Sequence, residues 1–391
     1  MQKFYIVKNT GAWMMDELVA FSERTKFSIL FLRKQEIFYD DKISSLEKNG
    51  IKIYYLRDHK KYNRSKFLFC LKFLIIHFNC FLNLHCLIYG IKSLNYFLQL
   101  DLGIFESRNV NFHCQFATQP AIFGLLMKEY FKTDFSYSFT FHAYDIFVNN
   151  LWFKTLTLNS ESAFSISKFN INYVIKKYNI KDYSKLHYSP LGVFPPKVIP
   201  VVRSVTENNI LRLGFLSYFV EMKGIRFLLP AIIKLKKSNI RFVMNIAGDG
   251  PLKEEMISFV ERNSLKENVI FHGLVKNESK YNFFRDLDLF ILPSVSRGME
   301  TDGLPVVLME AVSYGLPIIS TKISGIPEIC INGYNGYLIE QKSVEEIVNA
   351  ITKFSENSFK WLEFSRNSLE ISRKYDIKIN SRMKLKMLGW E

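Results

Sequence analysis

The sequence predicts an α/β protein with two doubly wound domains, each a parallel sheet covered by helices on both faces. Its 391 residues exceed what one hydrophobic core usually serves and suit two domains. Short β-branched and aromatic runs alternate with helix-length segments, which is the pattern of βαβ units. In the second half these runs are apolar on both faces, as expected for strands buried in a parallel sheet.

Strands in the first half are expected at 4–7, 27–32, 51–56, 110–115, 137–141, 162–167 and 185–189, with a helix at 120–130. Four prolines between 190 and 200 favour an extended connector after this half. We therefore predict an N-terminal domain over residues 1–195 and a C-terminal domain over 196–375. The remaining tail, 376–391, is expected to pack back on the first domain.

The segment 66–100 is rich in Phe, Leu, Ile and Tyr, but polar residues interrupt every apolar run before it could cross a bilayer. One interpretation is a pair of helices packed into the core. The other is an apolar and basic face that lies on an anionic membrane surface. The sequence leaves both interpretations open.

In the second half, strands are expected at 211–216, 241–247, 269–271, 287–292 and 317–321. Doubly wound sheets bind ligands outside the carboxyl ends of their strands. The loops that follow these strands are therefore expected to carry the functional residues.

The charge balance is strongly basic, with 52 Lys and Arg against 37 Asp and Glu. This surplus suits nucleic acid, anionic lipid or a phosphorylated substrate, or it reflects base composition alone. We find no nucleic-acid-binding module and expect no nucleic-acid partner. A nicotinamide-dependent oxidoreductase is disfavoured because the segment after the first strand has a single glycine instead of GxGxxG.

The five cysteines form no zinc-ligand pattern, and the first twenty residues lack the apolar core of a signal peptide. We therefore expect a cytoplasmic protein, with peripheral contact to the inner face of the plasma membrane if segment 66–100 binds lipid.

The loop after the strand at 287–292 carries the first candidate site. Asp302 and Gly303 precede a helix that Pro305 is expected to open and that contains Glu310. A helix start beside a glycine exposes unpaired backbone N–H groups, which favour an anion. Two carboxylates at different depths can accept hydrogen bonds from sugar hydroxyls. An acid near a helix start also occurs simply because it complements the helix dipole.

Three further loops at the same sheet edge contain glycine. Lys223-Gly224 follows the first strand of this half and supplies a cation for phosphate. The turn from Gly248 to Gly250 follows the second strand, and alone it is an ordinary β-to-α turn. The turn from Ser324 to Glu328 follows the last strand, with Pro327 at a predicted helix start. Four such loops on one edge argue for a common site.

The stretch 302–336 reads DGLPVVLMEAVSYGLPIISTKISGIPEICINGYNG and resembles the donor site of retaining GT-B glycosyltransferases of the GT4 family, the glycosyl transferases group 1. That pattern has two acidic residues with seven between, a Gly-Ile-Pro-Glu turn and an Asn-Gly-aromatic stretch. The resemblance extends more thinly over most of the chain, through Lys223, the turn at 248–251, 271–273, His113 and 142–145. It implies a GT-B fold, with two Rossmann-like domains facing each other across a cleft.

The resemblance also implies roles for single residues. Glu310 would bind the nucleotide ribose, Asp302 the transferred sugar, and Lys223 the diphosphate. His142 would reach the donor sugar from the first domain, with Asp145 orienting nearby groups. A histidine after an apolar strand is otherwise often a packed core residue. The further substrate contacts implied are Gly248, Gly250, Gly303, Leu304, Pro305, Ser324, Gly325 and Glu328.

Two positions depart from the family pattern. Asp302 stands where the family more often has glutamate, which shortens the carboxylate's reach by one methylene. Phe215 stands where many relatives place an arginine that binds the diphosphate. Arg212, Arg226 and Arg297 are the candidate substitutes. The loop 9–12 is also poorer in glycine than in relatives that bind substrate there.

The implied activity is transfer of a hexose-type sugar from a nucleoside-diphosphate sugar to a hydroxyl of a glycan or lipid-linked acceptor, with retention of configuration and in cell-surface polysaccharide assembly. No cofactor or metal is required by this scheme. The alternative is an epimerase-like enzyme acting on a nucleotide sugar, or a relative that binds the donor but has lost transfer activity.

Overall fold

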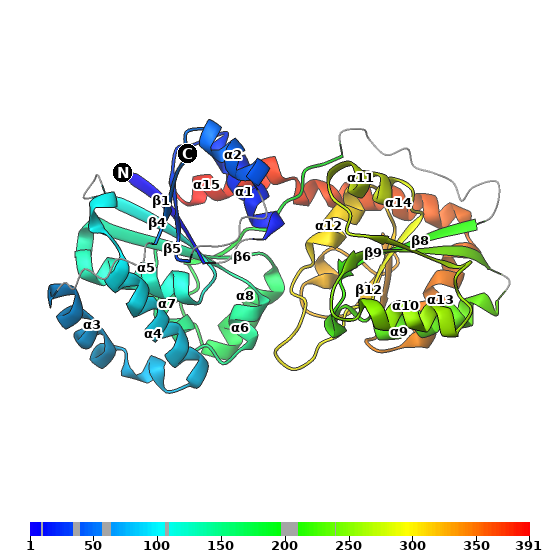
Figure 1. The fold of residues 1–391 in the computed structure, drawn as a ribbon, viewed down its shortest axis with the longest axis horizontal. Helices are drawn as coiled ribbons and strands as arrows, with labels where there is room; N and C mark the ends of the chain where they lie inside the picture. The colour runs from blue at the N-terminus through cyan, green and yellow to red at the C-terminus, as the bar shows by residue number, and fades with distance from the viewer. Residues whose placement is uncertain (9–10, 34–39, 57–63, 106–108, 197–209, 239) are drawn as a thin grey trace. The chain divides into compact units, whose positions relative to one another are not determined.

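The computed structural model describes residues 1–8, 11–33, 40–56, 64–105, 109–196, 210–238 and 240–391. The chain forms two compact units (Figure 1). Unit 1 contains Met1–Leu191 and Ile377–Glu391, and unit 2 contains Gly192–Asp376. Of the predicted loop 9–12, residues 9 and 10 lie outside the described residues. Most of the proline-rich connector, from 197 to 209, does so as well.

Unit 1 is built on a parallel sheet in the order β3-β2-β1-β4-β5-β6-β7. Its strands are β1 Gln2–Val7, β2 Ser28–Phe31, β3 Lys52–Tyr55, β4 Val110–Gln115, β5 Phe135–Phe141, β6 Ala163–Ser165 and β7 Leu186–Tyr188. Each lies within two residues of a predicted strand at either end. β1 and β4 are buried over most of their length. β1 ends in the apolar run Phe4–Val7, whereas β4 alternates apolar with buried polar residues, Asn111, His113 and Gln115.

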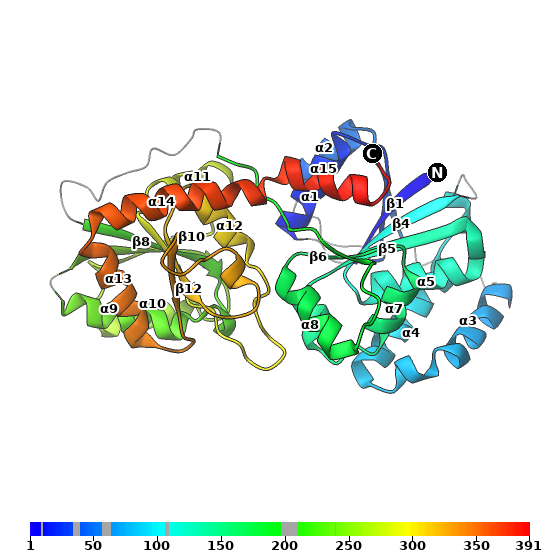
Figure 2. The same ribbon diagram turned by 180° about the vertical axis from the view of Figure 1, so that it is seen from behind.

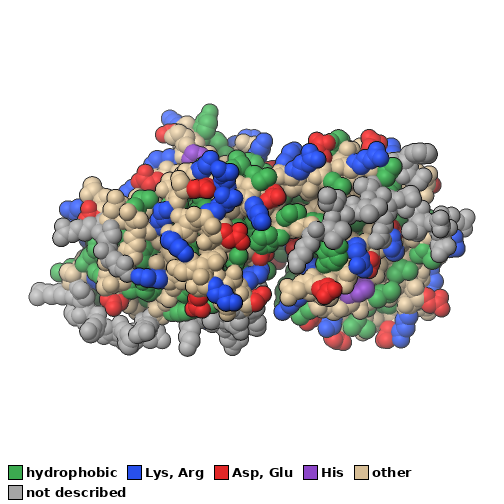
Figure 3. All heavy atoms as spheres, turned by 90° about the horizontal axis from the view of Figure 1, so that it is seen from above, with side chains coloured by type: hydrophobic (Ala, Val, Ile, Leu, Met, Phe, Trp, Pro, Cys, Tyr) green, Lys and Arg blue, Asp and Glu red, His purple; other side chains and the backbone are tan. Residues whose placement is uncertain are grey.

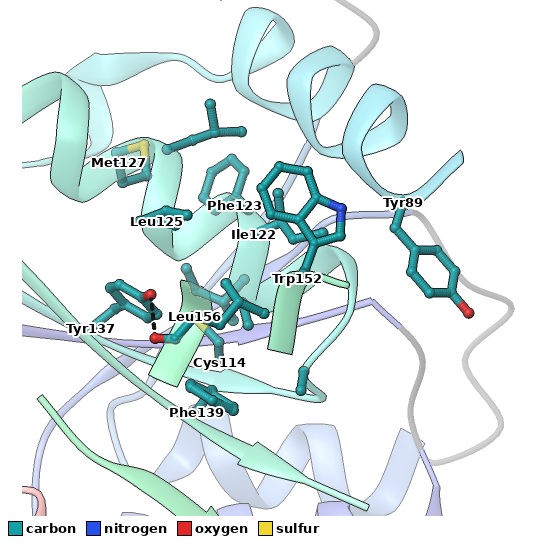
Figure 4. Packing of buried hydrophobic residues seen from close by; sticks show 14 of the residues in the cluster. Tyr89, Cys114, Ile122, Phe123, Leu125, Met127, Tyr137, Phe139, Trp152 and Leu156 are labelled. Atoms are coloured by element: carbon teal, nitrogen blue, oxygen red, sulfur yellow. Dashed lines mark hydrogen bonds between the residues drawn. The ribbon is translucent and has the colours of Figure 1, made fainter. Parts of the chain in front are cut away.

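Helices cover both faces of this sheet (Figures 1 and 2). One face carries α1 Ala12–Ser22, α2 Asp40–Lys48 and α15 Ile377–Met387, and the other carries α3 Arg64–Ile76, α4 Leu84–Gln99, α5 Gln119–Phe131 and α7 Trp152–Asn159. Two further helices, α6 Ala143–Phe147 and α8 Lys168–Tyr178, follow β5 and β6. Figure 4 shows the core under α4, α5 and α7, where Trp152 and Phe123 are fully buried. The Tyr137 hydroxyl there donates to the carbonyl oxygen of Leu156 at 2.8 Å.

Unit 2 has a second parallel sheet, in the order β10-β9-β8-β11-β12-β13. Its strands are β8 Ile210–Tyr218, β9 Arg241–Asp249, β10 Val269–Gly273, β11 Leu289–Leu292, β12 Ile318–Thr321 and β13 Gly336–Ile339. One face carries α9 Ile225–Lys236, α10 Lys253–Arg262 and α13 Val344–Ser355, and the other carries α11 Asn277–Arg285, α12 Val306–Ser313 and α14 Ser358–Ser372. The prediction of two doubly wound parallel-sheet domains is confirmed.

Some local predictions in unit 2 differ from the structure. The edge strand β13 was not predicted, because only two of its four residues are buried and it follows directly on a turn. β9 continues through Asp249, so Gly248 lies within the strand. Pro305 is the capping residue before α12, with extended backbone, and does not form the helix's first turn.

The C-terminal segment completes unit 1. On α15, Lys384 donates from Nζ to Glu17 Oε1 at 2.8 Å, and both side chains are buried. Beyond the helix, Trp390 is buried and its Nε1 donates to Asn111 Oδ1 at 2.7 Å. These contacts join residues more than 270 positions apart in the sequence.

The basic surplus is spread over the surface that Figure 3 shows, where lysine and arginine side chains lie among carboxylates on both units. Within the described ranges, no helix is long and apolar enough to cross a membrane.

Candidate active site

The strand order of unit 2 places two loops at the point where the chain changes direction across the sheet. The strands that follow β8 extend the sheet on one side, through β9 and β10, and β11 begins the extension on the other side. Ligands of doubly wound sheets bind at this switch point, outside the carboxyl ends of the strands. The loop after β8 carries Lys223 and the loop after β11 carries Asp302. The two loops touch, since Val295 N donates to Met222 O at 2.8 Å.

Asp302 binds partners from both loops. Its Oδ1 lies 2.5 Å from Lys223 Nζ, and its Oδ2 accepts a hydrogen bond from Ser294 Oγ at 2.6 Å. Ser294 is fully buried, and its carbonyl accepts from Thr321 Oγ1 at the end of β12. The carboxylate therefore has a fixed orientation and holds the lysine at the sheet edge. Asp302 and Lys223, which the sequence predicted as separate site residues, thus form one ion pair.

Glycine permits this close approach of the loops. Gly224 has φ +73°, and a Cβ atom built on it would lie 1.8 Å from the carbonyl oxygen of Pro293. Gly248 has φ +131°, and a Cβ there would lie 1.9 Å from the carbonyl oxygen of Ser217. Any larger residue would push the backbone apart at both places. Gly250 lies against the backbone of Phe219 in the same manner.

Glu310 also has a cationic partner, which sequence analysis missed. Glu310 lies on α12, and its Oε1 is 2.5 Å from Lys280 Nζ on α11. Burial and the charge of Glu310 raise the pKa of the nearby Tyr314 to about 12. Lys280 lies thirty residues before Glu310 in an ordinary polar helix, so no local pattern marks it. The site thus contains two acid–lysine pairs.

The turn from Ser324 to Glu328 joins the same edge. Gly325 N donates to Gly303 O at 2.9 Å, which fixes this turn against the loop that carries Leu304 and Pro305. The predicted helix start at Pro327 is a three-residue 3-10 helix, Ile326–Glu328. The structure therefore brings Gly303, Ser324 and Gly325 together with Asp302.

Two of the three arginines considered as substitutes at the diphosphate site are already paired. Arg212 lies near the amino end of β8, where its Nη2 is 2.6 Å from Asp288 Oδ1. This is the end of β8 opposite to the loop that carries Lys223. Arg226 pairs with Glu221 at 2.7 Å. Arg297 is exposed in the loop after β11 and is the remaining candidate. Phe215 itself is buried.

In unit 1, His142 follows β5 and is nearly buried. Its backbone N–H donates to Asp145 Oδ2 at 2.8 Å, and its ring packs between Trp13 and Phe116, with both centroids 5.0 Å away. Burial, together with the charge of Lys384, lowers the pKa of His142 to about 3. The ring is therefore neutral. Gln115 Nε2 lies 2.7 Å from His142 Nε2, and because an amide nitrogen donates, Nε2 must accept.

A buried polar chain lies behind His142. Gln115 Oε1 is 2.7 Å from the Tyr5 hydroxyl, which is 2.8 Å from Glu17, the partner of Lys384. Asp145 is fully buried, and burial raises its pKa to about 7.

His113 on β4 is a buried structural residue in this arrangement. Its ring nitrogens lie 2.9 and 3.0 Å from the hydroxyls of Ser138 and Thr140 on β5. Burial, together with the charge of Lys384, lowers its pKa well below the usual range.

Part of the chain matches a known protein family. Residues 204–373 match the family model described as glycosyl transferases group 1. A putative colanic acid biosynthesis glycosyltransferase of Escherichia coli is 31% identical over 165 residues, which are 42% of this chain and 39% of that protein. An uncharacterised glycosyltransferase of Methanocaldococcus jannaschii is 24% identical over 275 residues, 67% of this chain and 70% of that protein.

Solved structures resemble the whole chain in fold. A Rickettsia africae glycosyltransferase superposes with a TM-score of 0.70 at 16% identity, covering 99% of this chain and 97% of that one. Anabaena HepE, in complex with UDP and glucose, gives 0.67 at 14% identity, covering 100% and 99%. The fold is that of GT-B glycosyltransferases. The matched sequence spans less than two fifths of the length of the colanic acid relatives from Escherichia coli and Salmonella typhimurium, 39% and 34%.

Proposed function

We propose that this chain, whose residues 204–373 match the glycosyl transferases group 1 family model, is a retaining glycosyltransferase. The donor is a nucleoside-diphosphate hexose, and the acceptor is a hydroxyl of a glycan or lipid-linked glycan. Several relatives are named for exopolysaccharides, colanic acid and amylovoran, which supports a role in cell-surface polysaccharide assembly. Anabaena HepE is described with UDP and glucose, so UDP is the first nucleotide to test.

The observation that carries the proposal is the Lys223–Asp302 pair at the switch point of unit 2. We assign Lys223 to the diphosphate and Asp302 to hydrogen bonds from the transferred sugar. Glu310, held by Lys280, is assigned to the nucleotide ribose. His142 remains a proposed contact to the donor sugar from unit 1.

In the proposed step the bond between the sugar's anomeric carbon and the diphosphate oxygen breaks, and a bond to the acceptor oxygen forms. The negative charge that develops on the leaving diphosphate is met by Lys223 and by backbone N–H groups of the glycine-bearing loops. The proton of the acceptor hydroxyl passes to the departing diphosphate. Asp302, whose two oxygens are already hydrogen-bonded, is assigned to binding and not to nucleophilic attack.

Product analysis tests the proposal. The protein is incubated with UDP-glucose and a lipid-linked glycan acceptor, and the products are separated by mass spectrometry. A glycosylated acceptor and free UDP support transfer. A changed nucleotide sugar without acceptor modification supports the epimerase-like alternative. UDP binding without any product supports an inactive donor-binding relative.

A Lys223→Ala variant tests the site directly. Losing a hydrogen bond to a charged group is expected to weaken UDP binding by about 1.5–3 kcal/mol, as measured by calorimetry. Arg226→Ala is the matched control, because Arg226 is exposed and already paired with Glu221 and Glu255. Equal affinity in the two variants would remove Lys223 from the diphosphate site.

A further inference from the structure

The outward face of α3 is apolar, although α3 lies on the outside of unit 1 (Figures 1 and 2). Leu68, Leu71 and Ile75 recur three to four residues apart and share one side of the helix, which Ile76 widens. All four side chains are exposed, Ile75 by 78%. Helices on the outside of a soluble domain normally turn such a stripe toward the core.

The apolar surface continues through the following turn and along α4. Phe78 and Leu82 project from the turn and are 63% and 65% exposed. On α4, Leu84, Ile88 and Ile91 share the outward side, with Leu84 69% exposed. We call these side chains, together with the four on α3, the α3–α4 face. Contiguous apolar surface of this kind marks an interaction site.

The opposite sides of the two helices are firmly packed, so the outward face is fixed in place. Phe73 of α3 is fully buried and stacks on Trp152, with ring centroids 5.9 Å apart. In the turn, Phe81 packs so tightly on Gly90 of α4 that a Cβ atom at Gly90 would lie 2.3 Å from the Phe81 ring. Rotating either helix to bury its outward face would expose these residues.

The sequence of this region carries no acidic residue. Residues 64–100 contain no aspartate or glutamate and four lysine or arginine residues. His77 among them pairs with Glu129 of α5 at 2.7 Å. Lys66 turns inward, with Nζ 2.5 Å from Leu100 O, while Lys72 and Lys92 are exposed beside the apolar side chains. Besides burial, the charges of Lys92 and Arg33 lower the pKa of Lys8, so positive charge continues toward the carboxyl end of β1. A positive rim around apolar groups complements anionic headgroups above acyl chains.

We propose that the α3–α4 face is a membrane-contact surface that binds an anionic lipid bilayer. The apolar side chains enter the headgroup and acyl boundary, and Lys72 and Lys92 contact the lipid phosphates. A second copy of this chain fits the face less well, because symmetric pairing would bring the lysines of two copies toward one another. This inference does not depend on the proposed sugar transfer.

Vesicle flotation without donor or acceptor tests the proposal. Native protein is mixed with vesicles of equal parts phosphatidylcholine and phosphatidylglycerol, or of phosphatidylcholine alone. Binding is expected to the anionic vesicles at low salt and to weaken as salt is added. The double variant Ile75→Glu/Leu84→Glu is expected to lose binding by more than about tenfold, since both side chains are exposed and their burial in lipid is lost. Met383→Glu, at an exposed methionine of α15, is the matched control.

A charge variant separates the electrostatic contribution of the lysines from the apolar contribution to membrane binding. Lys72→Glu/Lys92→Glu is expected to weaken binding to anionic vesicles by about fivefold or more per lysine, while Lys181→Glu changes it little. Melting temperatures of all variants check that they fold. Native protein that fails to float with anionic vesicles at low salt, or apolar-to-glutamate variants that bind like the native protein, would overturn the proposal. A lipid-independent dimer that Ile75→Glu/Leu84→Glu converts to a monomer would also overturn it and assign the face to self-association.

Discussion

Replacing Asp302 with asparagine is expected to tighten the binding of UDP while slowing sugar transfer. In the structure Asp302 holds Lys223, with 2.5 Å between Oδ1 and Nζ, and the two side chains are 9% and 18% exposed. The carboxylate thus restrains the cation that we assign to the diphosphate. Asparagine keeps the size of the side chain but removes its charge. The ammonium becomes available, and the repulsion between carboxylate and diphosphate disappears.

The freed ammonium and the lost repulsion both favour UDP binding, and Coulomb's law gives the size of the repulsion. A carboxylate about 7 Å from one diphosphate charge, at an effective dielectric constant of about 20, opposes binding by roughly 2 kcal/mol. Partial exposure and salt screening reduce this figure. We therefore expect a gain of about 1–2 kcal/mol, which corresponds to roughly a five- to thirtyfold lower Kd for UDP.

Calorimetric titration with UDP and steady-state kinetics with UDP-glucose measure the two effects. Glu300→Gln is the control, since it removes one exposed negative charge from the same loop. Tighter UDP binding with lower kcat in Asp302→Asn, and neither change in Glu300→Gln, is the expected pattern. Unchanged or weaker UDP binding in Asp302→Asn would refute the reasoning and would mean that Asp302 places Lys223 for the ligand.

Further outcomes are expected at the Glu310–Lys280 pair, at His142 and at the Lys384–Glu17 pair. Glu310→Ala should nearly abolish sugar transfer. Lys280→Ala should lower kcat/KM by about tenfold or more, because Glu310 loses its charged partner. Native kinetics in Lys280→Ala would show that the Lys280–Glu310 pair is not needed for transfer. His142 has a pKa near 3 in the folded protein and about 6.5 in the unfolded chain, so the free energy of unfolding should fall as the pH drops from 6.5 toward 3. Urea unfolding at pH 7 and pH 5 measures this loss, which should be about 2 kcal/mol smaller in His142→Gln than in the native protein. Equal losses of unfolding free energy in the two proteins would contradict a His142 ring that is buried and neutral in the folded state. Lys384→Met should lower the free energy of unfolding by about 3–5 kcal/mol, because the buried carboxylate of Glu17 loses its cation. The double variant Lys384→Met/Glu17→Met should recover most of that loss. A Lys384→Met variant as stable as the native protein would contradict a stabilising role for the buried ion pair.

Local sequence predicted most of the fold, because buried parallel strands and glycine turns leave short-range patterns. β11 is a continuous apolar run and β12 begins with two isoleucines, and the predicted ends of both strands lie within two residues of the observed ones. The four glycine-bearing loops were assigned to one sheet edge by strand direction alone. β13 was missed, because a four-residue edge strand with two half-exposed positions has little periodicity.

Long-range pairings could not be predicted in the same way. Lys280 lies in a polar helix that resembles many surface helices, and only the packing of α11 beside α12 brings it to Glu310. The buried pair of Lys384 and Glu17 spans 367 positions, and each residue alone looks like a surface charge. Sequence also left segment 66–100 open between two interpretations, since both sides of each helix are apolar and only the structure shows which side is buried.

The return of α15 to unit 1 sets the order in which the chain can fold during synthesis. The residues of unit 2 form one continuous stretch, whereas unit 1 needs Lys384 and Trp390, which the ribosome adds after all of unit 2. Until then Glu17 lacks its buried cation and Asn111 lacks the Trp390 indole. Synthesis of unit 1 therefore starts before that of unit 2 but ends after it. Until α15 has been made, the sheet face that it covers is exposed to chaperones and to neighbouring chains.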